Sequence, residues 1–201
     1  MDPIETTVTA VREIGPDAVA IDIETPSDLD AAPGQFVKLS TIIDGESTGR
    51  FYTISSSDTE ETFELTVSYD PEEGGDFSEY LVSIRAGDSI TITGPFGSNY
   101  YEHEPRVVVL AGGPGIGPAV AIAERALEDG GDAAVVYRDD NPLHEDRLAE
   151  LSAAGADVVV LTDSPGEQVF IYGFADFLAD AETALEAAGT DPDAAKSENF
   201  G

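Results

Sequence analysis

The sequence contains no cysteine among its 201 residues. This absence excludes disulfides, zinc sites with thiolate ligands and iron–sulfur clusters held by cysteine. The only histidines are His103 and His144, which are too few for a histidine-rich metal site. We expect both histidines to be surface or loop residues, and we expect no metal site.

Long apolar runs are also missing. No run approaches the roughly 20 residues that a membrane-spanning helix needs. The first residues, MDPIETTVTAV, lack the basic segment followed by an apolar one that marks a secretory signal. We therefore expect a cytoplasmic protein without membrane insertion. Apolar residues still make up 41% of the chain, which is enough for a packed core.

Basic residues are scarce. Lysine and arginine together number 9 against 41 aspartates and glutamates, and the formal net charge is −32. Nucleic acids and anionic membranes would repel such a chain. The acidic residues are spread along the whole sequence, a balance typical of a high-salt cytoplasm such as that of a haloarchaeon, where the Debye length at about 1 M salt is only roughly 3 Å. An ordinary acidic protein is the alternative.

The chain has two halves with different periodicities. From Thr6 to about Gly97, short alternating runs are separated by Gly, Pro and Asp, with one helix-like piece, DFSEYLVSI. This pattern predicts an antiparallel barrel or sandwich. From Arg106, strand-like and helix-like segments alternate, which predicts a parallel α/β sheet. The boundary falls near residues 99–105, and the first strand of the second half, RVVVLAGG, is expected to be buried on both faces.

A glycine-rich turn, AGGPGIGPAV at residues 111–120, lies between this strand and a predicted helix. Glycines there allow a ligand to approach the backbone, and a helix N-terminus offers unpaired N–H groups to a phosphate. The spacing differs from the common Gly-x-Gly-x-x-Gly pattern. The turn therefore predicts a phosphate or dinucleotide site, with a tight turn that binds nothing as the alternative.

The stretch RFYTISSS, residues 50–57, reads as a strand that begins with an arginine. Arg50 either pairs with a surface carboxylate or binds an anionic group, which a guanidinium recognises well. Arg50 and Tyr52 are two residues apart, so they are expected on the same face of the strand.

In several motifs the chain resembles the ferredoxin–NADP reductase superfamily. The family's flavin motif Arg-x-Tyr-Ser/Thr is matched by Arg50, Tyr52 and Thr53, and its strand entry PGQF by residues 33–36. Its Gly-x-x-Ser motif is matched by residues 75–78, and AGDSITITGPFG at 86–97 resembles its last barrel strand. The Gly-Gly-Thr-Gly-x-x-Pro motif is matched by residues 112–118, with Pro114 in place of Thr, and Glu-x-Phe by residues 198–200.

The resemblance implies a Greek-key flavin barrel at residues 1–99 followed by a nucleotide-binding α/β domain at residues 105–201. It implies FAD as the cofactor, and NADH or NADPH as the electron donor. It also implies two overlapping sets of site residues. The catalytic set is Tyr52, Thr53, Glu198 and Phe200. The cofactor-binding set is Arg50, Phe51, Tyr52, Thr53, Tyr69, Gly75, Phe77, Ser78, Gly112, Gly113, Gly115, Ile116, Gly117, Pro118, Arg138, Gly173 and Phe174.

Two departures from the family pattern bear on the nucleotide half. Where the family carries Cys-Gly-Pro, this chain has Tyr172-Gly173-Phe174, so the thiol beside the nicotinamide is absent. The segment between LTDSPG and QVFIYG is short. Arg138 either contacts the nucleotide ribose or its 2′-phosphate, or pairs with a nearby aspartate.

The implied function is electron transfer from NAD(P)H through FAD to a separate acceptor, such as a ferredoxin, a flavodoxin or an oxygenase component. The acceptor must be separate because the chain has no cysteine cluster to hold its own iron–sulfur centre. The alternative is a non-enzymatic flavin-binding or electron-transfer subunit of a larger complex.

Overall fold

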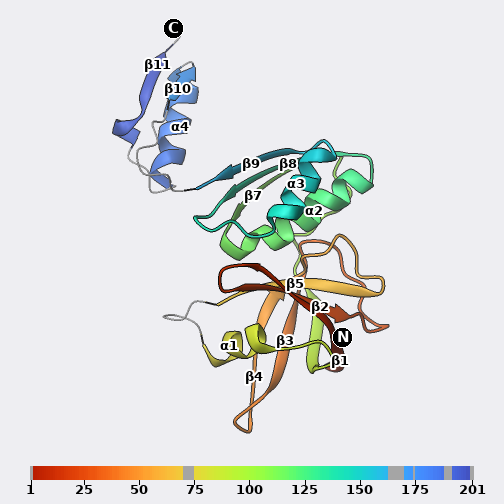
Figure 1. Ribbon diagram of the computed structural model, residues 1–201. Helices are drawn as coiled ribbons and strands as arrows, with labels where there is room; N and C mark the ends of the chain where they lie inside the picture. Colours follow the sequence, from red (N-terminus) through yellow and green to blue (C-terminus); the bar gives the residue numbers. More distant parts are fainter. Residues whose placement is uncertain (1, 70–74, 163–169, 174, 188–191, 200–201) are drawn as a thin grey trace. The chain divides into compact units, whose positions relative to one another are not determined.

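A computed structural model describes residues 2–69, 75–162, 170–173, 175–187 and 192–199 (Figure 1). The chain forms two compact units, Met1–Thr162 and Asp163–Gly201. Among the described helices, none has the length and apolar composition that crossing a membrane requires. The first unit contains β1 Ile4–Gly15, β2 Ala18–Glu24, β3 Phe36–Ile43, β4 Glu46–Thr53, β5 Thr62–Ser68, α1 Asp76–Ser83, β6 Ser89–Phe96, β7 Arg106–Gly112, η1 Gly113–Gly115, α2 Ile116–Glu128, β8 Asp132–Arg138, α3 Glu145–Ala153 and β9 Asp157–Leu161.

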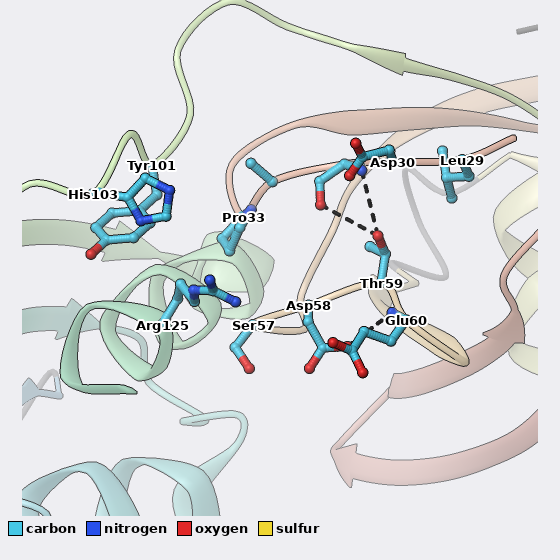
Figure 2. A pocket seen from close by; sticks show the side chains of 12 residues that line it. Leu29, Asp30, Pro33, Ser57, Asp58, Thr59, Glu60, Tyr101, His103 and Arg125 are labelled. Atoms are coloured by element: carbon cyan, nitrogen blue, oxygen red, sulfur yellow. Dashed lines mark hydrogen bonds between the residues drawn. The ribbon is translucent and has the colours of Figure 1, made fainter. Parts of the chain in front are cut away.

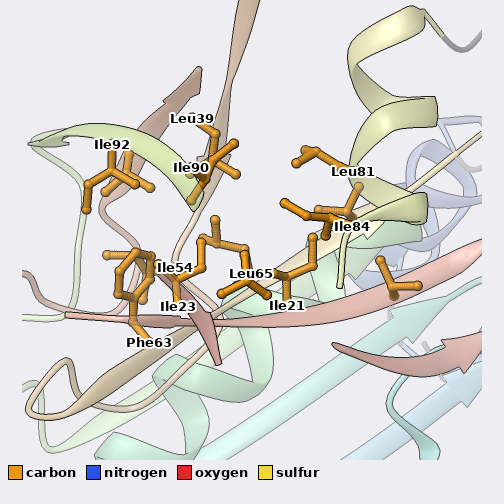
Figure 3. Close-up of a cluster of buried hydrophobic side chains, with 14 of the residues drawn as sticks. Ile21, Ile23, Leu39, Ile54, Phe63, Leu65, Leu81, Ile84, Ile90 and Ile92 are labelled. Atoms are coloured by element: carbon orange, nitrogen blue, oxygen red, sulfur yellow. The ribbon is translucent and has the colours of Figure 1, made fainter. Parts of the chain in front are cut away.

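The first six strands form one antiparallel sheet in the order β4-β3-β6-β1-β2-β5. An isolated bridge between Ile54 and Leu65 joins its two edges, so the sheet closes into a barrel. Side chains alternate along these strands, and those that point inward form one apolar core (Figure 3). In β5, for example, Phe63, Leu65 and Val67 are buried in this core. The expected antiparallel barrel is therefore confirmed.

The second half of this unit is a parallel sheet in the order β7-β8-β9, with α2 and α3 packed against it (Figure 1). Helix α2 ends in a Schellman motif, because Gly130 N–H donates to Leu127 O and Gly131 N–H to Ala126 O, at 2.9 and 2.8 Å. Gly130 has φ +80°, a conformation that favours glycine. The predicted strand–helix alternation is confirmed.

Within the first unit, only one face of β7 is buried, whereas burial on both faces was expected. Val107 faces the helices and is 8% exposed, whereas Val108 and Leu110 are 63% and 77% exposed. Successive side chains of a strand point to opposite faces, and α2 packs on the face of Val107. An apolar run of residues therefore does not by itself show that both faces of its strand are buried.

The second unit, residues 163–201, contains a small parallel sheet of two strands in which Tyr172 is aligned with Glu198. In the first unit, the last barrel strand ends at Phe96 and the first parallel strand begins at Arg106. The division into domains at residues 99–105 stays a prediction. The second unit contains β10 Phe170–Gly173, α4 Ala175–Ala187, η2 Pro192–Ala194 and β11 Lys196–Asn199.

Candidate functional site

The end of β4 presents the side chains that the sequence singled out. Arg50 lies opposite Leu39 and Tyr52 opposite Val37, so the two share one face of the strand, as expected. Arg50 Nη1 donates to the carbonyl oxygen of Gly49 at 3.0 Å. Within the described part of the chain, Arg50 forms no ion pair with a carboxylate. Its charge is therefore not neutralised by any described acid.

Tyr52 links β4 to the start of α1. Its ring lies 6.4 Å from that of Phe77. Burial raises the pKa of Tyr52, although the Ser78 hydrogen bond and the charge of Arg50 oppose this effect. The phenol therefore stays neutral near pH 7 and can donate a hydrogen bond. Phe77 itself is 2% exposed, so its side chain belongs to the barrel core.

A cavity of about 280 Å³ brings together three segments that are distant in the sequence. The end of β4, the start of α1 and the glycine-rich turn before α2 all contribute to it, and so does the outer face of β5. Its lining residues are Phe51, Tyr52, Thr53, Thr66, Ser68, Ser78, Pro114, Gly115 and Pro118. Six of these nine belong to the sets expected from the sequence, namely Phe51, Tyr52, Thr53, Ser78, Gly115 and Pro118.

The glycines of the motifs differ in what they do. Gly113 has φ +53°, and a Cβ on Gly117 would overlap Thr66 Oγ1 and Ser55 Oγ. The backbone conformation at position 113 and the tight packing at position 117 therefore explain why these two residues are glycine. A Cβ on Gly75 or on Gly115 would meet no other atom of the described residues within 4 Å, so packing among these residues requires neither to be glycine. Open space over these two backbones is what close approach of a ligand needs.

The remaining expected residues are distributed as follows. Ile116 is fully buried in the core under α2, and Arg138 at the end of β8 is aligned with Gly112 at the end of β7. Tyr69 follows β5, and its N–H donates to Asp17 O at 2.8 Å. Gly173 and Glu198 lie in the second unit, in β10 and β11. Phe174 and Phe200 lie outside the described residues.

A buried polar cluster behind the cavity was not expected from the sequence. Thr66 Oγ1 lies 2.8 Å from His144 Nε2 and 3.0 Å from Ser55 Oγ. His144 is in a loop, which the expectation of a surface or loop residue allows, but it is only 5% exposed and therefore not a surface residue. Its ring contacts Thr66 on the outer face of β5, and Arg147 of α3, the helix that begins at the next residue, binds Glu64 of the same strand.

Charge is concentrated beside this cluster. Glu64 is 6% exposed and binds Arg147 at 2.7 Å and Arg12 at 2.6 Å. Burial raises the pKa of Glu64, whereas the two arginines lower it. Burial, reinforced by the charges of Arg147 and Arg12, lowers the pKa of His144 to about 4, so the imidazole is neutral near pH 7.

One sequence signal for this cluster existed but was ambiguous. In TFELTVS, polar Glu64, Thr66 and Ser68 alternate with the core residues of β5. Such a pattern is also that of a strand with one face in water. A single sequence therefore could not distinguish a solvent face from a polar interface.

A larger cavity, of about 490 Å³, lies elsewhere in the first unit (Figure 2). It is lined by Asp30, Asp58, Thr59 and Arg125, among others, and by none of the expected catalytic or cofactor-binding residues, although Pro33 of the PGQF segment lies there. His103 at its edge is exposed and binds Asp129 Oδ2 at 2.6 Å. Nowhere in the described ranges do three or more histidine, aspartate or glutamate residues form a group that could hold a metal ion.

Comparison with known proteins supports the resemblance. Residues 5–101 match the family described as oxidoreductase FAD-binding domain. The electron transfer component of toluate 1,2-dioxygenase from Pseudomonas putida is 31% identical over 68% of this chain and 38% of its own length. The ferredoxin reductase component of 3-ketosteroid-9-alpha-monooxygenase from Mycolicibacterium smegmatis is 30% identical over 94% of this chain and 63% of its own length. The chain thus spans less than two thirds of either relative.

The fold is also similar to that of known reductases. A ferredoxin NADP+ reductase from Neisseria gonorrhoeae, solved with bound FAD and NADP, aligns with a TM-score of 0.67 at 18% identity, over 99% of each chain. This confirms the expected fold class of a flavin barrel followed by a small parallel α/β sheet. The FAD-binding match and the reductase relatives also bear out the expected cofactors, FAD and NADH or NADPH. Residues 5–101 therefore match an oxidoreductase FAD-binding domain, and the fold of the chain is that of ferredoxin NADP+ reductases of known structure.

Proposed function

We propose that this protein is a flavoprotein reductase that passes electrons from NADH or NADPH, through FAD, to a separate acceptor. We assign FAD to residues 1–99 and the nicotinamide nucleotide to residues 105–201. The observation that carries the proposal is the 280 Å³ cavity, because it unites the flavin motif of β4, the start of α1 and the glycine-rich turn. A site between these segments suits a transfer from one cofactor to the other.

The residues present fit FAD. Arg50 has no carboxylate partner in the described part of the chain, so its guanidinium is available to a phosphate. Gly75 leaves open space among the described residues at the start of α1, where Ser78 lines the cavity together with Tyr52. A phosphate-bearing flavin needs these features: a cation, an accessible helix start and a neutral aromatic donor.

Bound FAD would supply hydride acceptance and one-electron donation, and the chain would supply binding and orientation. Arg50 would hold a phosphate, Tyr52 would lie against the flavin ring, and Thr53 would donate or accept a hydrogen bond at the ring's edge. Gly113 and Gly115 would admit the nicotinamide nucleotide near the start of α2. Glu198 and Phe200 would contribute from the second unit, with Gly173 and Phe174 in place of the usual Cys-Gly-Pro segment.

The acceptor we propose is a ferredoxin, a flavodoxin or an oxygenase component. The relatives that are electron transfer or reductase components of oxygenases support this class of partner. We further propose a high-salt cytoplasm as the working environment, because a net charge of −32 repels itself strongly in dilute buffer.

The test is to purify the full chain in multimolar KCl, identify the bound flavin by extraction and chromatography, and titrate it anaerobically with NADH and then NADPH. We expect FAD, reduced by at least one of the two nucleotides. FMN alone, or no flavin after reconstitution, would contradict the cofactor assignment. Bound FAD that neither nucleotide reduces would instead favour a non-enzymatic electron-transfer subunit.

A further inference from the structure

Two buried hydroxyls, those of Ser55 and Thr66, lie at the wall of the 280 Å³ cavity. Ser55 is fully buried, and Thr66 is 6% exposed. Ser55 Oγ accepts from the Thr66 backbone N–H at 3.1 Å, lies 3.0 Å from Thr66 Oγ1, and donates to the Thr53 carbonyl oxygen at 3.4 Å. Thr66 and Thr53 both line the cavity. The hydroxyl pair therefore connects β5 to the last residue of the flavin motif.

The direction of these hydrogen bonds follows from counting protons. Ser55 Oγ has one proton, which goes to Thr53 O, so it accepts both bonds from Thr66. The Thr66 hydroxyl proton is then used toward Ser55, and Thr66 Oγ1 must accept from His144 Nε2 at 2.8 Å. In this arrangement His144 carries its proton on Nε2. The result is one chain of donors from His144 through Thr66 and Ser55 to the Thr53 carbonyl.

The same two hydroxyls also pack against the segment that follows the glycine-rich turn. Gly117, in the first turn of α2, packs against Thr66 Oγ1 and Ser55 Oγ so closely that a Cβ would overlap both. A rotation of the Thr66 hydroxyl would therefore change the hydrogen bonding toward Thr53 and the packing at the start of α2. Only His144, among the described residues, donates to Thr66 from outside the barrel.

We propose that His144 is a positioning residue for the flavin site: its Nε2–H orients the Thr66 and Ser55 hydroxyls, which fix the Thr53 carbonyl at the cavity wall. The inference rests on the proposed function, since the orientation of Thr53 matters if Thr53 contacts the flavin. His144 itself touches no cofactor in this scheme. It acts across the interface between the barrel and the parallel sheet.

Five variants of the full chain, reconstituted with FAD in multimolar KCl, test the proposal. Thr66→Val and His144→Leu remove a link of the donor chain. Thr66→Ser keeps the hydroxyl, and His144→Gln keeps an N–H donor. Leu143→Ala is the matched control, because Leu143 is 4% exposed in the same loop but lies outside the donor chain. The readouts are the dissociation constant of FAD, the visible spectrum of the bound flavin and the urea midpoint of unfolding.

We expect Thr66→Val and His144→Leu to weaken FAD binding about tenfold, the effect of losing roughly one hydrogen bond, and to shift the flavin spectrum. Thr66→Ser and His144→Gln should restore both readouts toward the wild type. Leu143→Ala should lower the unfolding midpoint and leave the spectrum unchanged. The proposal is overturned if Thr66→Val and His144→Leu keep the wild-type spectrum, or if Leu143→Ala shifts it equally.

A second measurement separates this inference from the proposed function. Nitrogen-15 chemical shifts of the His144 imidazole in the protein without FAD report which ring nitrogen carries the proton. A proton on Nε2 supports the donor chain, and a proton on Nδ1 overturns it, even if FAD does not bind. Failure of the wild-type chain to bind FAD would contradict the proposed function alone.

Discussion

Arg147 Nη1 lies 2.7 Å from Glu64 Oε1, and this ion pair joins helix α3 to the outer face of strand β5. Arg147 also makes two hydrogen bonds to Glu124, from Nε at 2.8 Å and from Nη2 at 2.6 Å. Its side chain is 18% exposed and that of Glu64 is 8% exposed. A chain with only nine basic residues therefore places one of them in the interface behind the cavity.

Replacing Arg147 by Met should destabilise the protein by about 3 kcal/mol, because it leaves Glu64 buried with one cation fewer. Urea unfolding in constant high KCl measures the loss. Arg12→Met is the matched control. Arg12 also binds Glu64, but its side chain is 51% exposed, so we expect a loss of less than about 1 kcal/mol. Equal losses for the two variants would show that burial does not decide the strength of these pairs.

Gly117→Ala and Gly115→Ala should behave differently. A Cβ on Gly117 overlaps the Thr66 and Ser55 hydroxyls, and such overpacking typically costs about 1–3 kcal/mol of stability. Gly115 has helical angles, φ −62° and ψ −10°, and open space around it, so Gly115→Ala should leave the unfolding midpoint nearly unchanged. Any effect of Gly115→Ala should fall on FAD or nucleotide binding, because Gly115 lines the cavity. A large loss of stability in Gly115→Ala would contradict the assignment of open space there.

Stability should depend on pH through His144. Its pKa is about 4 in the folded protein, against an ordinary value of 6.5, so the unfolded chain binds more protons between these two pH values. Stability from this residue is therefore fully present above about pH 6.5 and is lost as the pH falls toward 4, by about 3 kcal/mol.

His144→Gln provides the comparison for this pH effect, because glutamine does not titrate while Glu64, which faces His144 Nε2 at 3.9 Å, titrates in both proteins. The difference in urea midpoint between wild type and variant should change across pH 4–6.5 and stay constant above it. A constant difference over the whole range would show that the folded protein protonates His144 normally.

Arg50→Ala should weaken FAD binding by about 1.5–3 kcal/mol, the range for hydrogen bonds to a charged group. Because Arg50 binds only the Gly49 carbonyl within the described residues, folding at saturating FAD should persist. Equilibrium titration of the protein without flavin measures the change. Wild-type affinity in the variant would mean that Arg50 does not contact a phosphate.

Reduction of an acidic ferredoxin should become faster as KCl rises from about 0.1 M to a few molar, because salt screens the repulsion between two acidic proteins. The control is stopped-flow reduction of the bound flavin by NAD(P)H at each salt concentration, which separates docking from folding. If transfer to ferredoxin slows with salt while flavin reduction is constant, a locally basic docking face exists. Substitutions of Arg12, Lys38, Arg85 and Lys196, one at a time, would then locate that face.

The sequence by itself determined the order and kind of the elements. Alternation in β5 and in β4, and the strand–glycine–helix pattern at residues 106–128, are local properties that a period of two or 3.6 reveals. The same local pattern placed Arg50 and Tyr52 on one strand face. These features depend on neighbours in the chain, so one sequence was enough.

Only the tertiary structure decided what covers each face. Glu64 and Thr66 occupy positions that a solvent-facing strand would also fill with polar residues, yet α3 and His144 cover them. Val108 and Leu110 carry apolar side chains in an exposed face of β7. The reason for glycine at position 117 is likewise a contact with hydroxyls more than fifty residues earlier in the chain. Burial is a property of surfaces brought together from distant segments, so the periodicity of one segment cannot specify it.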